Sequence, residues 1–164
     1  MKTRIGVIGS DGPVPKEACR TAEAIGEQIA RRGCVLICGG KGGIMEAASR
    51  GASKAGGIVV GILPSFDRKE ANPYVTIPIT TGMSHSRNAL VAAASDAVIA
   101  IHGRAGTLSE IGLALCIGRP VVAVRGSGGV AGAIEQGLCA MQIEKKVRTA
   151  DAKDCVDVAL SLVE

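Results

Sequence analysis

The sequence is nearly free of aromatic residues: its 164 residues include one Phe, one Tyr and no Trp. Proteins that bind single-stranded nucleic acid commonly stack the bases on aromatic side chains, so this scarcity argues against that function. The net charge of +4 is spread along the chain. Such a mild excess is compatible with an anionic small molecule and gives no strong sign of DNA or RNA. We therefore expect no nucleic-acid partner.

Metal ligands and membrane segments are also scarce. The chain has only two His, and its six Cys form no CxxC pair, so the spacing typical of a metal site is missing. We expect no metal site and interpret the cysteines as small buried hydrophobes in a reducing compartment. No apolar run approaches a membrane span, and MKTRIGVIG begins with a strand pattern rather than a signal peptide. These features predict a cytoplasmic protein without membrane contact.

What the chain has in abundance is aliphatic residues, because hydrophobic types make up 47% of it. Without aromatics, the core must be packed from Ala, Val, Ile and Leu. Such side chains suit helix–sheet–helix layers whose strands are buried on both faces. The length fits one domain, and no stretch has the composition of a linker. We therefore predict that residues 1–164 form a single domain.

Strand patterns and helix patterns alternate along the chain. Runs rich in Val and Ile predict strands at 4–9, 34–38, 57–63, 75–81, 97–101, 120–124 and 145–150. The stretches between them predict helices at 16–32, 44–55, 84–95, 107–117, 133–141 and 151–163. Residues 64–74 are expected to be a loop, and Pro78 indicates an edge strand or a bulge. This order predicts an α/β fold, a doubly wound Rossmann-like domain with a mainly parallel sheet.

The 23 glycines gather after the predicted strands. The clusters are Gly9 and Gly12; Gly39, Gly40, Gly42 and Gly43; Gly103 and Gly106; and Gly126, Gly128 and Gly129. In open α/β sheets the ligand lies beyond the carboxyl ends of the strands, where glycine lets backbone N–H groups and a helix N-terminus approach an anion. Turn geometry can explain each cluster alone, but several at one sheet edge favour a phosphate-bearing ligand. No loop fits GxGxxG or GxxxxGK[ST] cleanly, which disfavours a standard NAD domain and a P-loop NTPase.

The stretch HGRAGTLSE, residues 102–110, has two interpretations. Thr107 and Glu110 have the spacing of a capping box, which would explain those two residues as the start of a helix. Arg87 alone would then be a surface residue. The alternative is a site for a phosphorylated ligand, built from the strand-to-helix corner and its neighbours.

A resemblance bears on this choice. The segment SHSRNALVAAASDAVIAIHGRAGTLSEIGLAL, residues 84–115, resembles the signature region of the Lonely guy family, also known as lysine decarboxylase-like proteins. That family carries an Arg on one helix and then a PGGxGTxxE motif. The matching residues here are Arg87, Gly103, Gly106, Thr107 and Glu110. The loop GGKGGIM is similar to the family's GGxxGxM element, with Met45 at the matching position. The RN pair at 87–88 and the short chain look most like the branch that contains molybdenum cofactor carrier proteins.

The resemblance implies a homodimeric Rossmann-like fold. It also implies, from the best-studied members, cleavage of the N-glycosidic bond of cytokinin nucleoside 5′-monophosphates, with Arg87 and Glu110 as the catalytic residues and no cofactor required. A carboxylate at Glu110 would stabilise positive charge on the sugar or activate water. Arg87 would hold the phosphate or steady the glutamate. Carrier-type relatives keep a similar motif and bind molybdenum cofactor, which also carries a phosphate monoester.

The residues expected to bind the ligand come from these loops and motifs. They are Gly9, Ser10, Gly39, Gly40, Gly42, Gly43, Met45, Arg87, Asn88, Gly103, Arg104, Gly106 and Thr107. Two residues depart from the family pattern: His102 replaces Pro, and Arg104 replaces the second Gly, where a long side chain would narrow the pocket or contact an anion.

Two functions follow as hypotheses. The first is a carrier or sensor that binds a nucleoside monophosphate or a molybdopterin-type cofactor. The alternative is a nucleoside 5′-monophosphate phosphoribohydrolase. A purely structural domain is disfavoured by the glycine corners. In either case we expect a phosphorylated small molecule as the partner and a homo-oligomer, dimer or tetramer.

Overall fold

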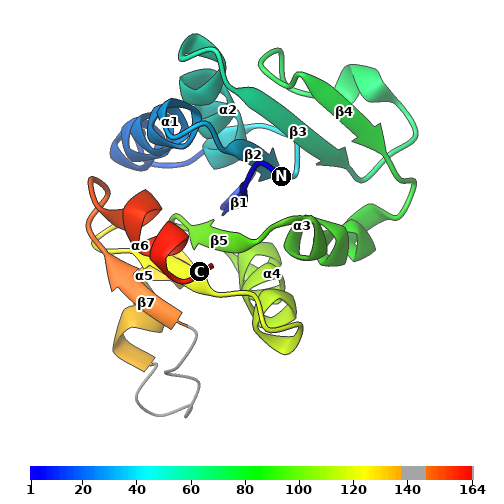
Figure 1. Ribbon diagram of the computed structural model, residues 1–164. Coiled ribbons are helices and arrows are strands. Elements are labelled where there is room, and N and C mark those ends of the chain that lie inside the picture. The colour runs from blue at the N-terminus through cyan, green and yellow to red at the C-terminus, as the bar shows by residue number, and fades with distance from the viewer. Residues whose placement is uncertain (138–146, 164) are drawn as a thin grey trace.

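The computed structural model describes residues 1–137 and 147–163. Its centre is a seven-stranded sheet in the order β4-β3-β2-β1-β5-β6-β7, and every described pairing between neighbouring strands is parallel (Figure 1). The strands are β1 (Arg4–Ile8), β2 (Val35–Cys38), β3 (Ile58–Leu63), β4 (Ile77–Thr80), β5 (Ala97–Ala100), β6 (Val121–Val124) and β7 (Val147–Ala150). The sheet confirms the α/β prediction.

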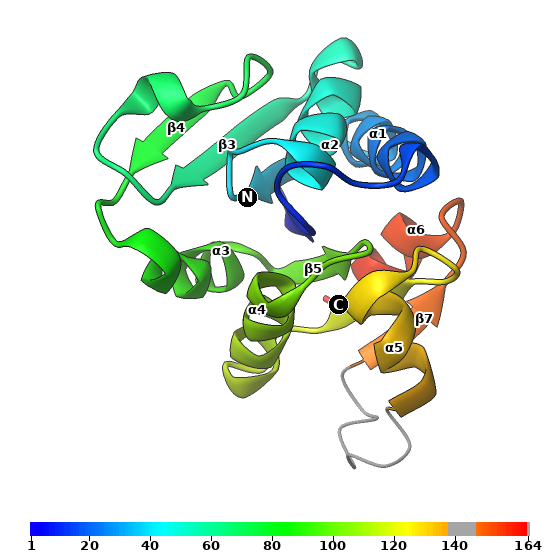
Figure 2. The same cartoon turned by 180° about the vertical axis from the view of Figure 1, so that it is seen from behind.

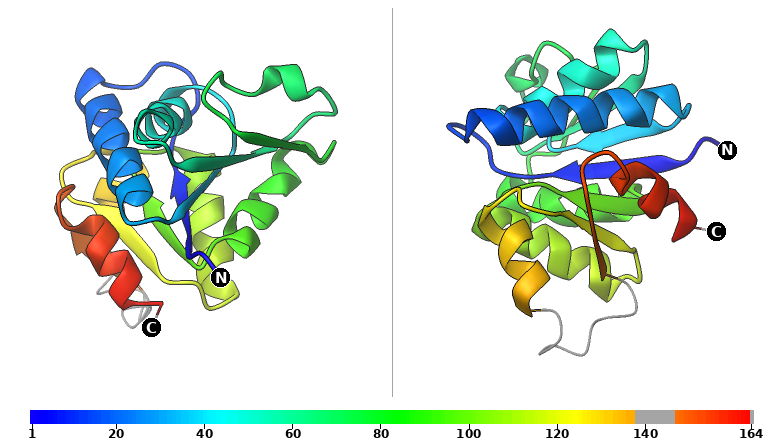
Figure 3. Two further views of the ribbon diagram at one scale, coloured as in Figure 1. Left: turned by 45° about the horizontal axis from the view of Figure 1, so that its top comes forward. Right: turned by 90° about the vertical axis from the view of Figure 1, so that its left-hand side faces the viewer.

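Helices cover both faces of the sheet (Figure 3). On one face lie α1 (Lys16–Arg31), α2 (Gly43–Lys54) and α6 (Cys155–Ser161), and on the other lie α3 (Asn88–Ala94), α4 (Ala105–Cys116) and α5 (Gly129–Gly137). Side chains alternate along each strand, so Ile5 and Val7 of β1 join the first core and Ile8 joins the second. β5 and β6 are buried along their whole length and consist only of Ala, Val and Ile, whereas the edge strand β4 is largely exposed.

The strand order reverses between β1 and β5. On one side of β1 lies β2, which the chain reaches through α1, and then β3, which it reaches through α2. The later strands β5, β6 and β7 lie on the other side of β1 (Figure 2). The connections after β1 and after β5 therefore leave the sheet in different directions. Ligands of doubly wound proteins bind in the crevice at such a reversal, beyond the carboxyl ends of the strands.

The predicted segments agree with the observed elements in type and order. Each predicted strand overlaps an observed strand, and each predicted helix overlaps an observed helix. Residues 138–141 of a predicted helix and 145–146 of a predicted strand lie outside the described residues. β4 is an edge strand, as Pro78 indicates. Among the described helices, none combines the length and the apolar character that a membrane crossing requires.

Several predicted boundaries are wrong. The segment predicted as a helix at 84–95 begins with a 3₁₀ turn, η2 (Ser84–Arg87), and the predicted loop at 64–74 contains another, η1 (Arg68–Glu70). α5 begins four residues before its predicted start. α6 begins only at Cys155, because the carbonyl of Asp151 accepts hydrogen bonds from the N–H groups of Asp154 and Cys155 in a turn that precedes the helix.

The start of α4 decides between the two interpretations of HGRAGTLSE. The helix begins at Ala105, its N-cap is Arg104, and no side chain caps it. Thr107 therefore lies inside the first turn rather than at the cap, and the capping-box interpretation is wrong. Gly103, with a φ of 97°, turns the chain two residues ahead of the helix. Both Thr107 and Glu110 are buried.

Helices α1 and α2 pack backbone against backbone. A Cβ on Gly26 would overlap the carbonyl oxygen of Ala48, and a Cβ on Gly51 would overlap that of Glu23. These two glycines let the helices approach closely over the sheet. The resulting contact fixes the position of the N-terminal end of α2, which lies beside the crevice.

We expect Gly51→Ala to lower the free energy of unfolding by about 1–3 kcal/mol, because the added methyl group forces the helices apart. This loss is expected even though Ala stabilises an exposed position within a helix by about 1 kcal/mol relative to Gly. Gly112→Ala is the matched control: Gly112 lies exposed on α4, and no described atom lies within 4 Å of its added Cβ. The control should gain about 0.5–1 kcal/mol. Urea unfolding of both variants measures the difference, and equal effects would contradict the close contact.

Candidate functional site

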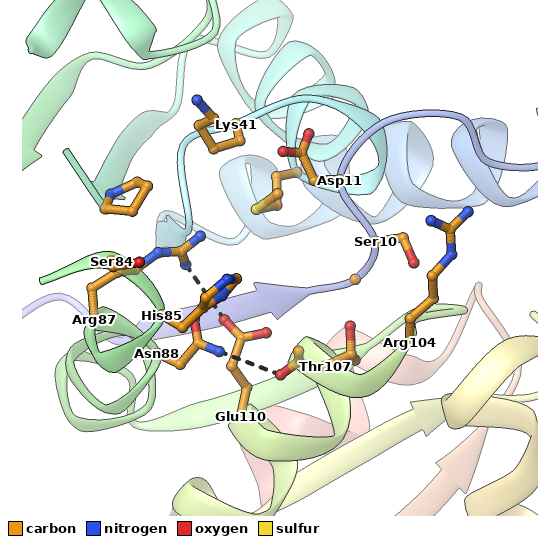
Figure 4. Close-up of a pocket in the computed structure, with 14 residues that line it drawn as sticks. Ser10, Asp11, Lys41, Ser84, His85, Arg87, Asn88, Arg104, Thr107 and Glu110 are labelled. Carbon is orange, nitrogen blue, oxygen red and sulfur yellow. Dashed lines mark hydrogen bonds and ion pairs between the residues drawn. The ribbon is translucent and has the colours of Figure 1, made fainter.

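A cavity of about 380 Å³ opens at the carboxyl edge of the sheet, where the strand order reverses (Figure 4). The residues that line it are Gly9, Ser10 and Asp11 after β1; Lys41 and Met45 after β2; Pro64, Ser84, His85, Arg87 and Asn88; and Arg104, Gly106, Thr107 and Glu110 after β5. Five segments far apart in the sequence thus meet at one place. Ligand cavities commonly have volumes of about 300–1,000 Å³.

A buried pair of opposite charges forms one wall. Arg87, at the end of η2, places Nη1 3.5 Å from Oε1 of Glu110 on α4, and the two side chains are 10% and 8% exposed. Nε and Nη1 of Arg87 have no hydrogen-bond partner within the described residues. Buried donors normally find a partner. These two buried nitrogens are therefore donors whose hydrogen-bonding capacity the described residues leave unused.

Burial changes the acidity of Glu110. It raises the pKa of this carboxyl group from 4.5 to about 7, and the positive charge of Arg87 opposes the shift without cancelling it. Near neutral pH the group exists in both protonation states. A carboxyl group with such a pKa is suited to accept or donate a proton during a reaction.

Gly39 and Asn88 hold this pair in place. A Cβ on Gly39 would overlap the guanidinium of Arg87, so glycine leaves the space that the arginine fills. Asn88 Nδ2 donates a hydrogen bond of 2.9 Å to Oγ of Ser109, which ties the segment carrying Arg87 to α4. Gly39 thus leaves room for Arg87, and Asn88 keeps the segment of Arg87 close to the helix that carries Glu110.

The N-terminal end of α4 faces the cavity. Leu108 N–H donates the first hydrogen bond of the helix, to the carbonyl of Arg104. The N–H groups of the preceding residues, Ala105 to Thr107, therefore have no acceptor within the helix. A Cβ on Gly106 would meet no described atom within 4 Å, which shows open space there. Ser10 lies at the same place, is 6% exposed, and its Oγ has no partner in the described part of the chain. Helix N–H groups, the helix dipole and a free hydroxyl together form a place for an anion.

Arg104 adds a cation at the rim of this place. Its side chain lines the cavity and its Nη2 donates to the carbonyl of Pro13 at 3.2 Å. His102 lies elsewhere: it lines a separate cavity with Ser127 and adopts a φ of 55°. Proline cannot adopt that φ, so the backbone at this corner departs from a motif that begins with Pro.

The glycines of the second loop lie behind the cavity wall. Gly39, Gly40, Gly42 and Gly43 are not among its lining residues. Gly40, with a φ of 71°, packs on Leu63, where a side chain would not fit. From this loop only Lys41 and Met45 reach the cavity. The contact of these glycines with a ligand stays a prediction, and the structure gives Gly39 and Gly40 a packing role as well.

Gly103 has a similar role at the α4 corner, since it lies behind Thr107 rather than in the lining. The lining does contain the other expected residues. They are Gly9, Ser10, Met45, Arg87, Asn88, Arg104, Gly106, Thr107 and Glu110.

Five lining residues were missed by the sequence analysis: Asp11, Lys41, Pro64, Ser84 and His85. Ser84 and His85 lie three and two residues before Arg87 in the segment that resembles the family. Their closeness to Arg87 in the sequence could therefore have predicted that they line the cavity. Ser84 also has a φ of 50°, which is unusual for a residue other than glycine. Nothing in the local pattern marks Pro64, because it reaches the cavity only through the fold.

No group of three or more His, Cys, Asp or Glu in residues 1–137 and 147–163 could hold a metal ion. The groups that line the cavity are instead cations, carboxyl groups, hydroxyls and backbone N–H groups. They form a candidate site for a small molecule in a doubly wound α/β protein.

The chain belongs to the SLOG cluster4 family, whose sequence profile matches residues 2–158. An uncharacterised protein of Archaeoglobus fulgidus is 46% identical over 124 residues, which cover 74% of this chain and 80% of that protein. A probable cytokinin riboside 5′-monophosphate phosphoribohydrolase of Oryza sativa subsp. japonica is 34% identical over 66% of this chain. The match covers 46% of the rice protein, so this chain spans about half of its length.

Two solved structures match over nearly the whole chain. The molybdenum cofactor binding protein from Rippkaea orientalis is 34% identical, with a TM-score of 0.91 and coverage of 100% of this chain and 99% of that one. The molybdenum cofactor carrier protein of Chlamydomonas reinhardtii is 31% identical, with a TM-score of 0.87 and coverage of 99% of both chains. These matches confirm the fold and the predicted family resemblance.

The raised pKa of Glu110 predicts a pH-dependent stability. A carboxyl group whose pKa is about 7 in the folded protein and 4.5 when fully exposed to water binds its proton more tightly in the folded protein. The folded state should therefore lose about 3 kcal/mol as the pH rises from about 4.5 to about 7 and little above that. Glu110→Gln removes the titrating group and should flatten this part of the profile.

The measurement is the free energy of urea unfolding at pH 5 and pH 8 for wild type and Glu110→Gln. Other titrating groups are common to both proteins and cancel in the difference. An identical pH dependence in the two proteins would show that Glu110 has an ordinary pKa.

Proposed function

We propose that the protein binds a small molecule with a phosphate monoester, of the nucleoside monophosphate or molybdopterin type, as a carrier or sensor. The observation that carries this proposal is the open N-terminal end of α4 beside the buried, unpartnered hydroxyl of Ser10. Arg104 adds positive charge at the rim. A phosphate oxygen there would accept hydrogen bonds that the described residues leave unmade.

The similarity to molybdenum cofactor binding and carrier proteins supports the choice of a carrier. It extends over the full chain at 31–34% identity. A nucleoside monophosphate and a molybdopterin share the phosphate monoester, so the same cradle at α4 suits either. The remaining cavity, with Met45 on one side and Arg87 on another, would hold the organic part of the ligand.

A second candidate is a phosphoribohydrolase, and the buried Arg87–Glu110 pair favours it. In this reaction water adds to C1 of the ribose and the N-glycosidic bond breaks, giving free base and ribose 5-phosphate. Positive charge develops on the sugar as the bond breaks, and a carboxylate at Glu110 would stabilise it or take a proton from the water. Arg87 would hold that carboxylate in place. The rice relative is named for this activity.

A homo-oligomer stays a prediction. The surface that suits it is an apolar groove along α3 and α4, lined in part by Ala89, Ala105 and Leu113. Leu108 on the same helix is 53% exposed. Association of two copies through this face would remove apolar area from water.

The phosphate site can be tested with AMP as the probe. We expect Ser10→Ala to weaken AMP binding about tenfold, because a hydroxyl donor to a charged phosphate is lost. Ser53→Ala is the matched control, since Ser53 lies exposed on α2 outside the cavity lining. Titration calorimetry measures both. Equal affinities of wild type and Ser10→Ala would contradict the placement of the phosphate.

The hydrolase candidate is tested by product analysis. Wild type, Glu110→Gln and the control Glu27→Gln are incubated with a panel of nucleoside 5′-monophosphates, and free base is measured by chromatography; Glu27 lies half-buried on α1, outside the cavity lining. If the protein is a hydrolase, wild type and Glu27→Gln release base and Glu110→Gln is slower by at least about 100-fold. Absence of free base with every substrate would overturn this candidate and leave the carrier or sensor.

A further inference from the structure

Two long helices present their N-terminal ends at the cavity, and they differ in one respect. The N-terminal end of α4 is open, since no side chain caps it. The N-terminal end of α2, a helix of twelve residues, is occupied by the side chain of Asp11. Oδ1 of Asp11 accepts hydrogen bonds from the backbone N–H of Gly42, the N-cap residue, at 3.0 Å and from that of Gly12 at 2.8 Å.

The carboxylate of Asp11 thus lies at the N-terminal end of α2, where a bound anion could otherwise lie. A carboxylate at a helix N-terminus is stabilised by the same N–H groups and dipole that bind phosphate. Here the chain supplies its own anion to α2, and the side chain also lines the cavity. Figure 4 shows Asp11 on the α2 side, opposite Thr107 and Glu110 of α4.

The lysine on that side is paired with a carboxylate. Lys41 lines the cavity, but its Nζ lies 2.7 Å from Oε2 of Glu70. The α2 side therefore offers one fixed negative charge and a lysine that is already paired. The N-terminal end of α4 offers Arg104, open N–H groups and the neutral hydroxyl of Ser10, and the carboxyl group of Glu110 lies one helical turn further along.

We propose that Asp11 is a specificity-determining residue that restricts the site to ligands with one phosphate. The inference rests on the proposed phosphate site at α4. Asp11 follows Ser10 directly in the chain, and both residues line the same cavity. A diphosphate held at α4 by one phosphate would carry its second phosphate toward α2 only against the like charge of Asp11, at the helix end that would otherwise attract it.

The test compares AMP, ADP and inorganic phosphate as probes in titration calorimetry. Wild type should bind AMP at least about tenfold more tightly than ADP. Asp11→Asn keeps an oxygen acceptor for the N–H groups of Gly42 and Gly12 but removes the charge, so the ratio should fall to about threefold or less. Asp11→Ala also uncovers these N–H groups, and ADP should then bind as tightly as AMP or more tightly.

Glu46→Gln is the matched control. Glu46 lies in the first turn of the same helix and carries the same charge, but it is not part of the cavity lining. This variant should keep the wild-type ratio of AMP to ADP affinity. Circular dichroism and thermal unfolding of each variant establish that the compared proteins are folded.

The outcomes separate this inference from the function on which it rests. If phosphate and AMP bind to wild type but Asp11→Asn and Asp11→Ala leave the AMP to ADP ratio unchanged, Asp11 does not set specificity, while the site at α4 stands. If Glu46→Gln shifts the ratio as much as Asp11→Asn, general charge explains the effect and the inference is wrong. If neither phosphate nor AMP binds to wild type, the phosphate site and the inference are both overturned.

Discussion

Burial of a guanidinium and a carboxyl group side by side is the constraint on which the carboxyl edge of the sheet depends. Removing two charged groups from water is costly, and their mutual attraction compensates only when the geometry is good. The Arg87–Glu110 separation of 3.5 Å is moderate, and the carboxyl group responds with a pKa of about 7. Gly39 leaves room for the guanidinium, and Asn88 fastens its segment to α4. The surrounding residues thus maintain a pair that contributes little to stability by itself, and such an arrangement is typical of a functional site.

The reversal of strand order explains how one edge gathers groups of opposite character. Because β1 and β5 are neighbours whose connections diverge, the helices α2 and α4 approach the same cavity from opposite faces of the sheet. Two positive helix ends at one cavity would favour a doubly anionic ligand. Asp11 changes that balance, since it satisfies Gly42 at the end of α2 and leaves the end of α4 open. The N-terminal end of α4 is thus the helix end that is left open, and Glu110 of the same helix also lines the cavity.

Much of this arrangement follows from local sequence pattern. Short apolar runs rich in β-branched residues and bounded by Gly or Pro favour buried strands, so the sheet and its order of elements are readable. The meeting of Arg87 with Glu110 is readable only through the family resemblance, since 23 positions separate them. The start of α4 was misjudged because the Thr–Glu spacing of a capping box also occurs inside a helix, where three residues make almost one turn. For the glycines of the second loop, the sequence predicts a close approach without indicating which atom approaches. For Gly39 that atom belongs to Arg87.

Whether the site holds its ligand or cleaves it depends on what lies one helical turn from the phosphate. Glu110 is three residues beyond Thr107, so it lies about 4.5 Å further along the axis of α4. A nucleoside monophosphate anchored at the N-terminal end of α4 by its 5′-phosphate would extend its ribose toward that carboxyl group. A molybdopterin anchored in the same way has no N-glycosidic bond to present, so the same carboxyl group would act only as a hydrogen-bonding partner. The chemistry of the bound molecule, rather than a rearrangement of Arg87 and Glu110, would then separate a hydrolase from a carrier built on the same residues.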